Sequence, residues 1–131
     1  ATVTSLVEEV RAAMPKDVAL AIIPTTQSPN SLCWIEGSDL AALAKIARLE
    51  IPAYQSGIAA IVSDVAATKA TAGPGAQLGF ILRPTYPNLP TAADVRTAVR
   101  EIGAVGAASI SFYNYGHLRL SSLDWIKSAI S

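Results

Sequence analysis

Four short apolar runs recur along the chain at a nearly constant spacing. They cover Val18–Ile23, Leu49–Ala53, Leu78–Leu82 and Ala108–Tyr113, and their centres at residues 21, 51, 80 and 110 are 30, 29 and 30 residues apart. Each run has the length of a strand, and helical patterns lie between the runs. Strands that alternate with helices are typical of βαβ units. The pattern therefore predicts an α/β fold in which the four strands form a parallel sheet.

The polar residues between these runs supply helix start and stop signals. The start signals are a capping box of Ser5 with Glu8 before a leading helix, Ser38-Asp39 before a helix over Leu40–Arg48, Ser56-Gly57 before Ile58, Thr91 with Asp94, and Ser121 with Asp124. Stop signals are supplied by Gly73-Pro74-Gly75 and by the pair Gly103 and Gly106. A leading helix followed by four strand–helix units is the expected organisation.

Alternation within the runs separates two faces of the expected sheet. The face that packs on helices takes the large apolar residues: Leu49, Ile51, Ala53, Leu78, Phe80, Leu82, Ile110 and Phe112. The other face takes small or polar ones: Glu50, Pro52, Tyr54, Gly79, Ile81, Arg83, Ser109, Ser111 and Tyr113. Glu50 and Arg83 fall on this second face of neighbouring strands. A structural ion pair between them is one hypothesis for Arg83, and ligand binding is the other.

Composition limits the classes of protein to consider. A chain of 131 residues, 51% hydrophobic and 15% charged, predicts one folded domain over residues 1–131 and excludes disorder. Ten basic and ten acidic residues give zero net charge, so nothing favours nucleic-acid binding, and self-association is not opposed by charge. No apolar run approaches the roughly 20 residues that span a bilayer, so no membrane partner is expected.

Neither a metal nor an organic cofactor is expected. The lone Cys33 excludes an internal disulfide, and one His with one Cys is too few for a four-ligand zinc site. There is no glycine-rich nucleotide motif. This cysteine usage is typical of a reducing compartment and favours the cytoplasm. Cys33 itself is interpreted as a small buried apolar residue, and the turn at residues 34–37 as a hydrophobic staple, with the lip of a pocket as the alternative.

Polar and aromatic residues gather at the carboxyl ends of the expected strands, where α/β proteins place their functional sites. These ends hold all four tyrosines and the only histidine. Arg83 adds a planar fork of five donors, suited to a carboxylate or to sugar hydroxyls. For Tyr113 the alternative to a binding role is a structural one, in which its ring fills the mouth of a barrel. For His117 the alternative is a solvated loop residue. The predicted substrate-binding residues are Tyr54, Arg83, Tyr86, Tyr113, Asn114 and His117.

The segments Leu49–Tyr54, Phe80–Pro84 and Ala108–His117, with Leu118–Trp125 after them, resemble strands and the final helix of a TIM barrel. Over nearly its whole length the chain is similar to the C-terminal half of uncharacterised bacterial TIM-barrel proteins that resemble glycoside hydrolases. The resemblance implies a four-stranded (βα)4 half of a TIM barrel with a leading helix. It also implies a carbohydrate-binding cleft at the carboxyl ends of the strands.

The resemblance does not supply catalytic residues. Such hydrolases carry two carboxylates at strand ends, often on the fourth and seventh strands. If the four strands here are the fifth to the eighth, the seventh ends at Arg83-Pro84-Thr85, where no carboxylate stands. The isolated chain is therefore expected to bind its ligand without hydrolysing it. The alternatives are a non-catalytic module for a ligand or a partner, and a complete flavodoxin-like domain.

A half barrel also predicts a partner. The two edge strands would leave backbone groups unpaired, and such edges favour further strand pairing. The expected partner is a second copy of the chain or a complementary N-terminal half. The chain begins with Ala1 rather than Met, which fits a cleaved fragment, a shortened chain or a separate subunit.

Overall fold

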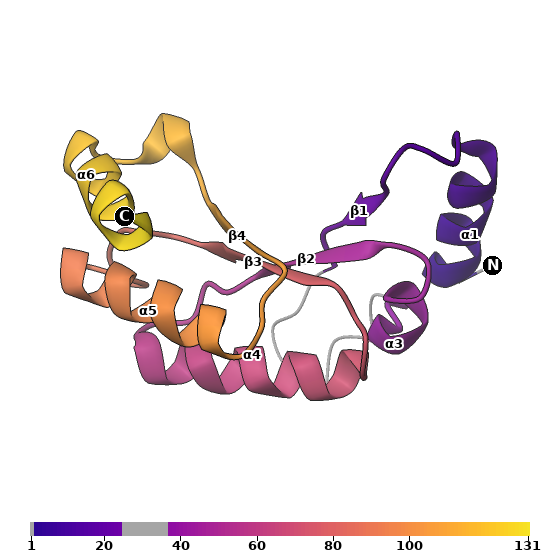
Figure 1. Cartoon of the computed structure of the whole chain (residues 1–131), viewed down its shortest axis with the longest axis horizontal. Helices are drawn as coiled ribbons and strands as arrows, with labels where there is room; N and C mark the ends of the chain where they lie inside the picture. The colour runs from indigo at the N-terminus through magenta and orange to yellow at the C-terminus, as the bar shows by residue number, and fades with distance from the viewer. Residues whose placement is uncertain (1, 25–36) are drawn as a thin grey trace.

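A computed structural model describes residues 2–24 and 37–131, and its centre is a parallel sheet of four strands (Figure 1). The strands are β1 (Ala21–Ile22), β2 (Arg48–Pro52), β3 (Leu78–Leu82) and β4 (Ser109–Phe112). They lie side by side in the order in which they occur in the sequence. The predicted α/β class and parallel pairing are therefore confirmed. The flavodoxin-like alternative does not fit, because a doubly wound sheet reverses its strand order.

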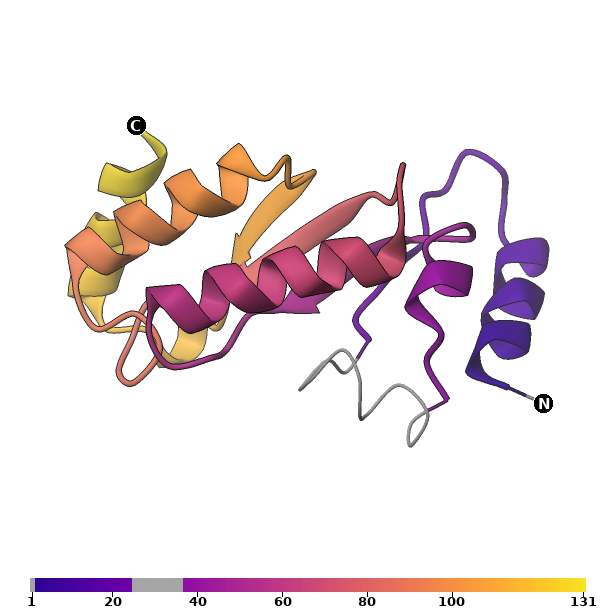
Figure 2. The same cartoon turned by 90° about the horizontal axis from the view of Figure 1, so that it is seen from below.

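The helices lie on one side of this sheet. They are α1 (Val3–Ala13), α3 (Leu40–Leu43), α4 (Ile58–Ala72), α5 (Ala92–Ala104) and α6 (Leu120–Ile130), with a 3-10 turn η1 (Tyr115–His117). Figures 1 and 2 show α4 and α5 along one face, α6 beside α5, and α1 with α3 at the β1 end. In the described part of the chain, no helix covers the opposite face. None of the described helices has the length and apolar character needed to cross a membrane.

The hydrophobic core fills the space between the sheet and α3, α4 and α5. From the sheet it takes Leu49, Ile51, Ala53, Leu78, Phe80 and Leu82, and from the helices Leu40, Leu43, Ile61, Val65, Val95, Ala98 and Ile102. Ile110 and Phe112 of the edge strand β4 are partly buried against it. The predicted helix-packing face is therefore confirmed on β2, β3 and β4. Alternation then leaves the polar residues of these strands on the uncovered face.

Several local signals have their expected roles. Thr91 and Asp94 form a reciprocal capping box that opens α5. Gly57 opens α4 and Gly73 ends it, each with a positive φ that side chains with a Cβ rarely adopt. Gly106, also at positive φ, reverses the chain after α5, whereas Gly103 lies inside that helix.

Two predicted helix starts are wrong. Thr2, not Ser5, is the N-cap of α1, because Ser5 is the third helical residue and completes a capping box with Thr2. The final helix starts at Leu120, one residue before the predicted Ser121, and its N-cap Arg119 makes no side-chain cap. The Ser-x-x-acid pattern appears in both places, but other residues provide the helix ends.

Two predicted elements are much shorter than expected, and β4 (Ser109–Phe112) lacks one residue at each end of the expected run Ala108–Tyr113. The helix expected over Leu40–Arg48 ends at Leu43, because Arg48 already pairs with Ala21 as the first residue of β2. The strand expected over Val18–Ile23 is reduced to Ala21–Ile22. Arg11 explains the second difference: its Nη1 donates to the carbonyl oxygen of Val18 at 2.7 Å, which turns that backbone group away from the sheet.

The strand register arranges the uncovered face in rows across β2, β3 and β4. Glu50 lies beside Gly79, which lies beside Ser109, and Pro52, Ile81 and Ser111 form the next row. Side chains two residues further along a strand return to the same face. The next row toward the carboxyl ends is therefore Tyr54, Arg83 and Tyr113.

This register overturns the ion pair predicted between Glu50 and Arg83. The two residues lie two rows apart, which is roughly 13 Å along the strands at about 3.3 Å per residue. Glu50 Oε1 instead accepts from Arg48 Nη2 at 2.7 Å and from Ser109 Oγ at 3.2 Å. Glu50 Oε2 is buried and has no hydrogen-bond partner among the described residues. Arg83 is thus left for the other hypothesis, ligand binding.

Candidate functional site at the carboxyl ends of the strands

The row nearest the carboxyl ends of the strands brings a cation between two aromatic rings. The guanidinium carbon of Arg83 lies 5.1 Å from the ring centroid of Tyr54 and 5.9 Å from that of Tyr113. The two tyrosine rings are 5.9 Å apart and tilted by 39°. These distances are in the range of cation–π and aromatic contacts. Residues that are 29 and 30 positions apart in sequence thus form one cluster.

A pocket of about 300 Å³ opens beside this cluster. Its lining residues are Arg83, Thr85, Tyr113, Asn114, His117 and Leu118. Four of the six predicted binding residues therefore line one pocket, and a fifth, Tyr54, contacts the arginine at its wall. The sixth, Tyr86, is 82% exposed in the turn at residues 86–88 and is not part of this lining.

The segment after β4 is shaped by hydrogen bonds close to the pocket. The Asn114 side-chain oxygen accepts from the backbone N–H of Gly116 at 3.0 Å, and the Asn114 carbonyl accepts from the N–H of His117 at 2.9 Å. Both bonds fold residues 115–117 into the turn η1. This turn carries His117 back to the pocket wall. The amide nitrogen of Asn114 keeps its two donors available to a ligand.

Two residues that the sequence analysis missed hold the loops of the site. The side-chain amide of buried Asn88 donates to the carbonyl oxygens of Tyr54 and Gln55. Buried Ser122 of α6 donates to the carbonyl oxygen of Pro84 at 2.8 Å. Their partners lie 33 to 38 residues away in sequence. No short-range pattern could have identified them, whereas Thr85 and Leu118 adjoin residues that were predicted.

The electrostatics of the cluster are set by burial and by Arg83. Burial raises the pKa of the Tyr54 phenol above its ordinary value, and the charge of Arg83 opposes this effect. Tyr54 is therefore a neutral hydroxyl at physiological pH. Among the described residues, the side chain of Arg83 makes no hydrogen bond and no ion pair, and none of the pocket residues is acidic. The wall of the pocket accordingly carries positive charge.

A second polar pair, Gln55 and Asp64, lies between the loop after β2 and α4. Gln55 Nε2 donates to Asp64 Oδ2 of α4 at 2.7 Å. Partial burial raises the pKa of the Asp64 carboxyl above its ordinary value, and the hydrogen bond from Gln55 acts in the opposite direction. Neither residue lines the pocket. The pair ties the loop after β2 to α4.

We expect replacement of this carboxyl to change how stability depends on pH. A carboxyl whose pKa is raised on folding stabilises the protein below its unfolded pKa, and this contribution is lost as the pH rises through the folded pKa. Asp64→Asn, which still accepts from Gln55, should therefore be more stable than the parent near neutral pH. Urea unfolding should show this advantage shrinking at pH values below the usual aspartate pKa. Asp124→Asn, at an exposed position of α6, is the control. An advantage that grows toward acid pH would contradict this assignment.

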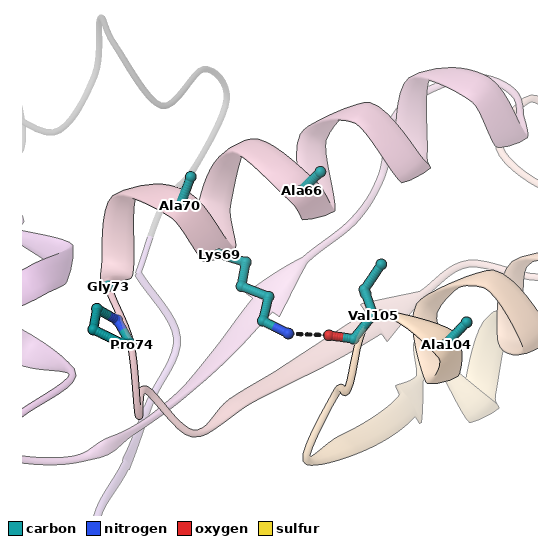
Figure 3. A pocket seen from close by; sticks show the side chains of 7 residues that line it. All are labelled: Ala66, Lys69, Ala70, Gly73, Pro74, Ala104 and Val105. Carbon is teal, nitrogen blue, oxygen red and sulfur yellow. Dashed lines mark hydrogen bonds between the residues drawn. The ribbon is translucent and has the colours of Figure 1, made fainter.

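Two larger hollows formed by described residues lie elsewhere and offer less chemistry. One, of about 550 Å³, runs between the ends of α4 and α5 and is lined mainly by alanines, Gly73, Pro74 and Val105 (Figure 3). Its only charged group, Lys69, donates to the carbonyl oxygen of Val105 and so caps the end of α5. The other, of about 490 Å³, lies at the strand starts beside Lys45 and Arg48, and Arg48 is already paired with Glu50.

Some predictions fall outside the described residues. Cys33 and the turn that begins at Trp34 are among them, as is the carboxyl end of the first strand beyond Pro24. Within residues 2–24 and 37–131, no three His, Cys, Asp or Glu side chains are grouped as they would be around a metal ion.

No family model, curated protein or solved structure matches the chain. The geometry of the carboxyl edge is therefore the basis of the function proposed next.

Proposed function

We propose that the chain is the C-terminal (βα)4 half of a TIM barrel and that its carboxyl edge binds a carbohydrate. Parallel strands in sequential order, with the helices of the described residues on one face, support the half-barrel interpretation. In a closed barrel the uncovered face would point inward. Its carboxyl end is the place where barrels of this type bind their substrates.

The observation that carries the proposal is the cluster of Tyr54, Arg83 and Tyr113 beside the pocket. Tyr113 is 47% exposed, so part of its ring is free to pack against the apolar face of a sugar. The pocket places Asn114, Thr85 and His117 around the same space, where they offer donors and acceptors to hydroxyl groups. A pocket of about 300 Å³ is at the lower end of the range for small-molecule sites, which favours a monosaccharide-sized ligand.

The proposed activity of this chain is binding and not hydrolysis. A glycosidase needs two carboxyl groups about 5 to 9.5 Å apart on either side of the scissile bond. The pocket lining holds none. Asp64 accepts a hydrogen bond from Gln55 and does not line the pocket. A second barrel half would have to bring the catalytic pair. Turnover of a glycoside by the pure chain would refute this part of the proposal.

We expect Tyr113→Ala to weaken sugar binding by about tenfold, a loss of about 1.4 kcal/mol, because the variant loses the ring that packs on the ligand. Tyr115→Ala is the matched control, since Tyr115 is two residues away, 80% exposed and outside the pocket. Chemical-shift mapping with glucose and glucuronate should place the ligand at residues 83–85 and 113–118. Shifts centred instead on the strand starts, around Asp17, Gln77 and Gly106, would refute the proposed site.

The half-barrel proposal also predicts association through the uncovered face and the strand edges. Sedimentation of the pure chain at micromolar concentration should show a species of twice 13.6 kDa. Ser111→Glu places a charge on the uncovered face of β4 and should favour the monomer. Ser121→Glu, on the exposed side of α6, should leave the dimer unchanged. A clean monomer for the unmodified chain would count against closure by a second copy.

A further inference from the structure

Arg83 is a half-buried cation for which the described chain supplies no anion. Its neighbours are the faces of Tyr54 and Tyr113, at 5.1 and 5.9 Å. Aromatic faces hold a guanidinium in place but accept none of its N–H groups in the manner of a carboxylate. A charged group partly withdrawn from water is most stable when its donors are paired. The geometry therefore leaves a fork of N–H donors available at the pocket wall.

The other polar groups of the pocket do not neutralise this charge. Thr85 and Asn114 are uncharged, and His117 can only add positive charge. Asn114 uses its side-chain oxygen on the N–H of Gly116, so toward a ligand it offers chiefly N–H donors. The pocket is thus rich in donors and poor in acceptors. A neutral sugar would leave the strongest donor, Arg83, without a matching group.

Resting on the function proposed above, we propose that the ligand is an acidic sugar, a uronic acid or a similar polyhydroxylated monocarboxylate, whose carboxylate is held by Arg83. A planar guanidinium matches a planar carboxylate through two parallel hydrogen bonds. The sugar ring would pack on Tyr113, and its hydroxyl groups would reach Asn114, Thr85 and His117. The two tyrosine rings hold the guanidinium in place before the ligand arrives, which reduces the entropy lost on binding.

The same features favour a carboxylate over a phosphate. Arg83 is the only permanently charged group in the pocket lining, and no lysine joins it. A phosphate monoester carries nearly two negative charges near neutral pH and usually requires several cations or backbone donors. A single arginine balances a single carboxylate. Inorganic phosphate is therefore expected to compete poorly for this site.

The test compares two pairs of sugars that differ only in the carboxylate: glucose with glucuronate, and galactose with galacturonate. Titration calorimetry on the full chain should show at least one acid binding about tenfold or more tightly than its neutral partner, the factor expected for a charge-assisted pair of hydrogen bonds. Arg83→Gln should bring the ratio of the acid's affinity to the neutral sugar's affinity close to one, since it removes the pairing with the carboxylate. Arg119→Gln makes the same change in net charge outside the pocket and should keep the preference.

The outcomes separate this inference from the proposed function. Equal binding of acid and neutral sugar by the parent chain would overturn the inference and leave the carbohydrate site standing. Equal loss in Arg119→Gln and Arg83→Gln would also overturn it, because net charge alone would then explain the preference. Tighter binding of inorganic phosphate than of either acid would reassign Arg83 to a phosphate. Failure of all four sugars to bind would refute the carbohydrate site together with the inference. Thermal unfolding of each variant checks that the fold is retained.

Discussion

Phe80→Ala is expected to destabilise the chain by about 3–5 kcal/mol, the largest loss of any single substitution considered for this protein. The Phe80 side chain is almost fully buried at the centre of the core, on the helix-packing face of β3. Its removal takes away the apolar area of the ring and leaves a cavity between the sheet, α4 and α5. The sheet, α4 and α5 are regular elements connected to the chain at both ends, so they can move together to fill this cavity only in part. Urea unfolding followed by circular dichroism measures the loss.

Tyr86→Ala is the matched control for this prediction. It also truncates an aromatic side chain, six residues further along, but Tyr86 is 82% exposed in the loop after β3. Exposed substitutions usually change stability by no more than about 0.5 kcal/mol. Comparable losses for the two variants would mean that Phe80 is not at the centre of the core. They would also mean that Tyr86 is buried by a contact that the described chain does not make.

Gly79→Ala is expected to cost about 1–3 kcal/mol although it adds only one methyl group. Gly79 faces the uncovered side of the sheet, between Glu50 on β2 and Ser109 on β4. A Cβ at this position would overlap Glu50 Oε2 and Ser109 Oγ. Accommodation would require the Glu50 carboxylate to move away from Arg48 and Ser109, breaking the contacts that pair it. Stability curves for parent and variant give the difference directly.

Gly103→Ala is the control for the same chemical change. Gly103 lies inside α5, and a Cβ there would meet nothing within 4 Å. Alanine in a helix interior is favoured over glycine by about 0.5–1 kcal/mol, so this variant should be more stable than the parent. The two glycine substitutions are therefore expected to have opposite signs. The same sign for both would contradict the close approach of Glu50 to Gly79.

The strands were largely predictable from the sequence because each core strand alternates large apolar with small or polar residues. Leu78–Leu82 has the predicted bounds, and the strand of Arg48–Pro52 is shifted by one residue. The ends of the first strand, at the edge of the sheet, were harder to predict. At Val18 the apolar pattern continues, but Arg11 takes the backbone carbonyl, and no pattern of apolar residues encodes such a contact.

The candidate site was predictable in position but not in pairing. The carboxyl-end rule identified Tyr54, Arg83 and Tyr113 as neighbours, and the structure brings them together. The predicted partner of Glu50 was wrong, because excluding Arg83 required the register of β2 against β3, whereas Arg48 lies two residues before Glu50 on the same strand and the same face. Tyr86 was misplaced because its position depends on the turn after Pro84. The alternation of faces along a strand does not determine where side chains beyond the strand point.

The sequential order of the strands has a consequence for biosynthesis. Each strand pairs only with the strand one helical connection before or after it, so no sheet contact waits for a distant part of the chain. Synthesis runs from the N-terminus, so each strand leaves the ribosome after the earlier neighbour with which it pairs. The strand pairs can therefore form in the order of synthesis. The binding site is completed later in synthesis. Arg83 directly follows β3, but the half-exposed Tyr113 and the turn that carries His117 are synthesised only after β4. A nascent chain would hold a folded sheet before it gained the ability to bind.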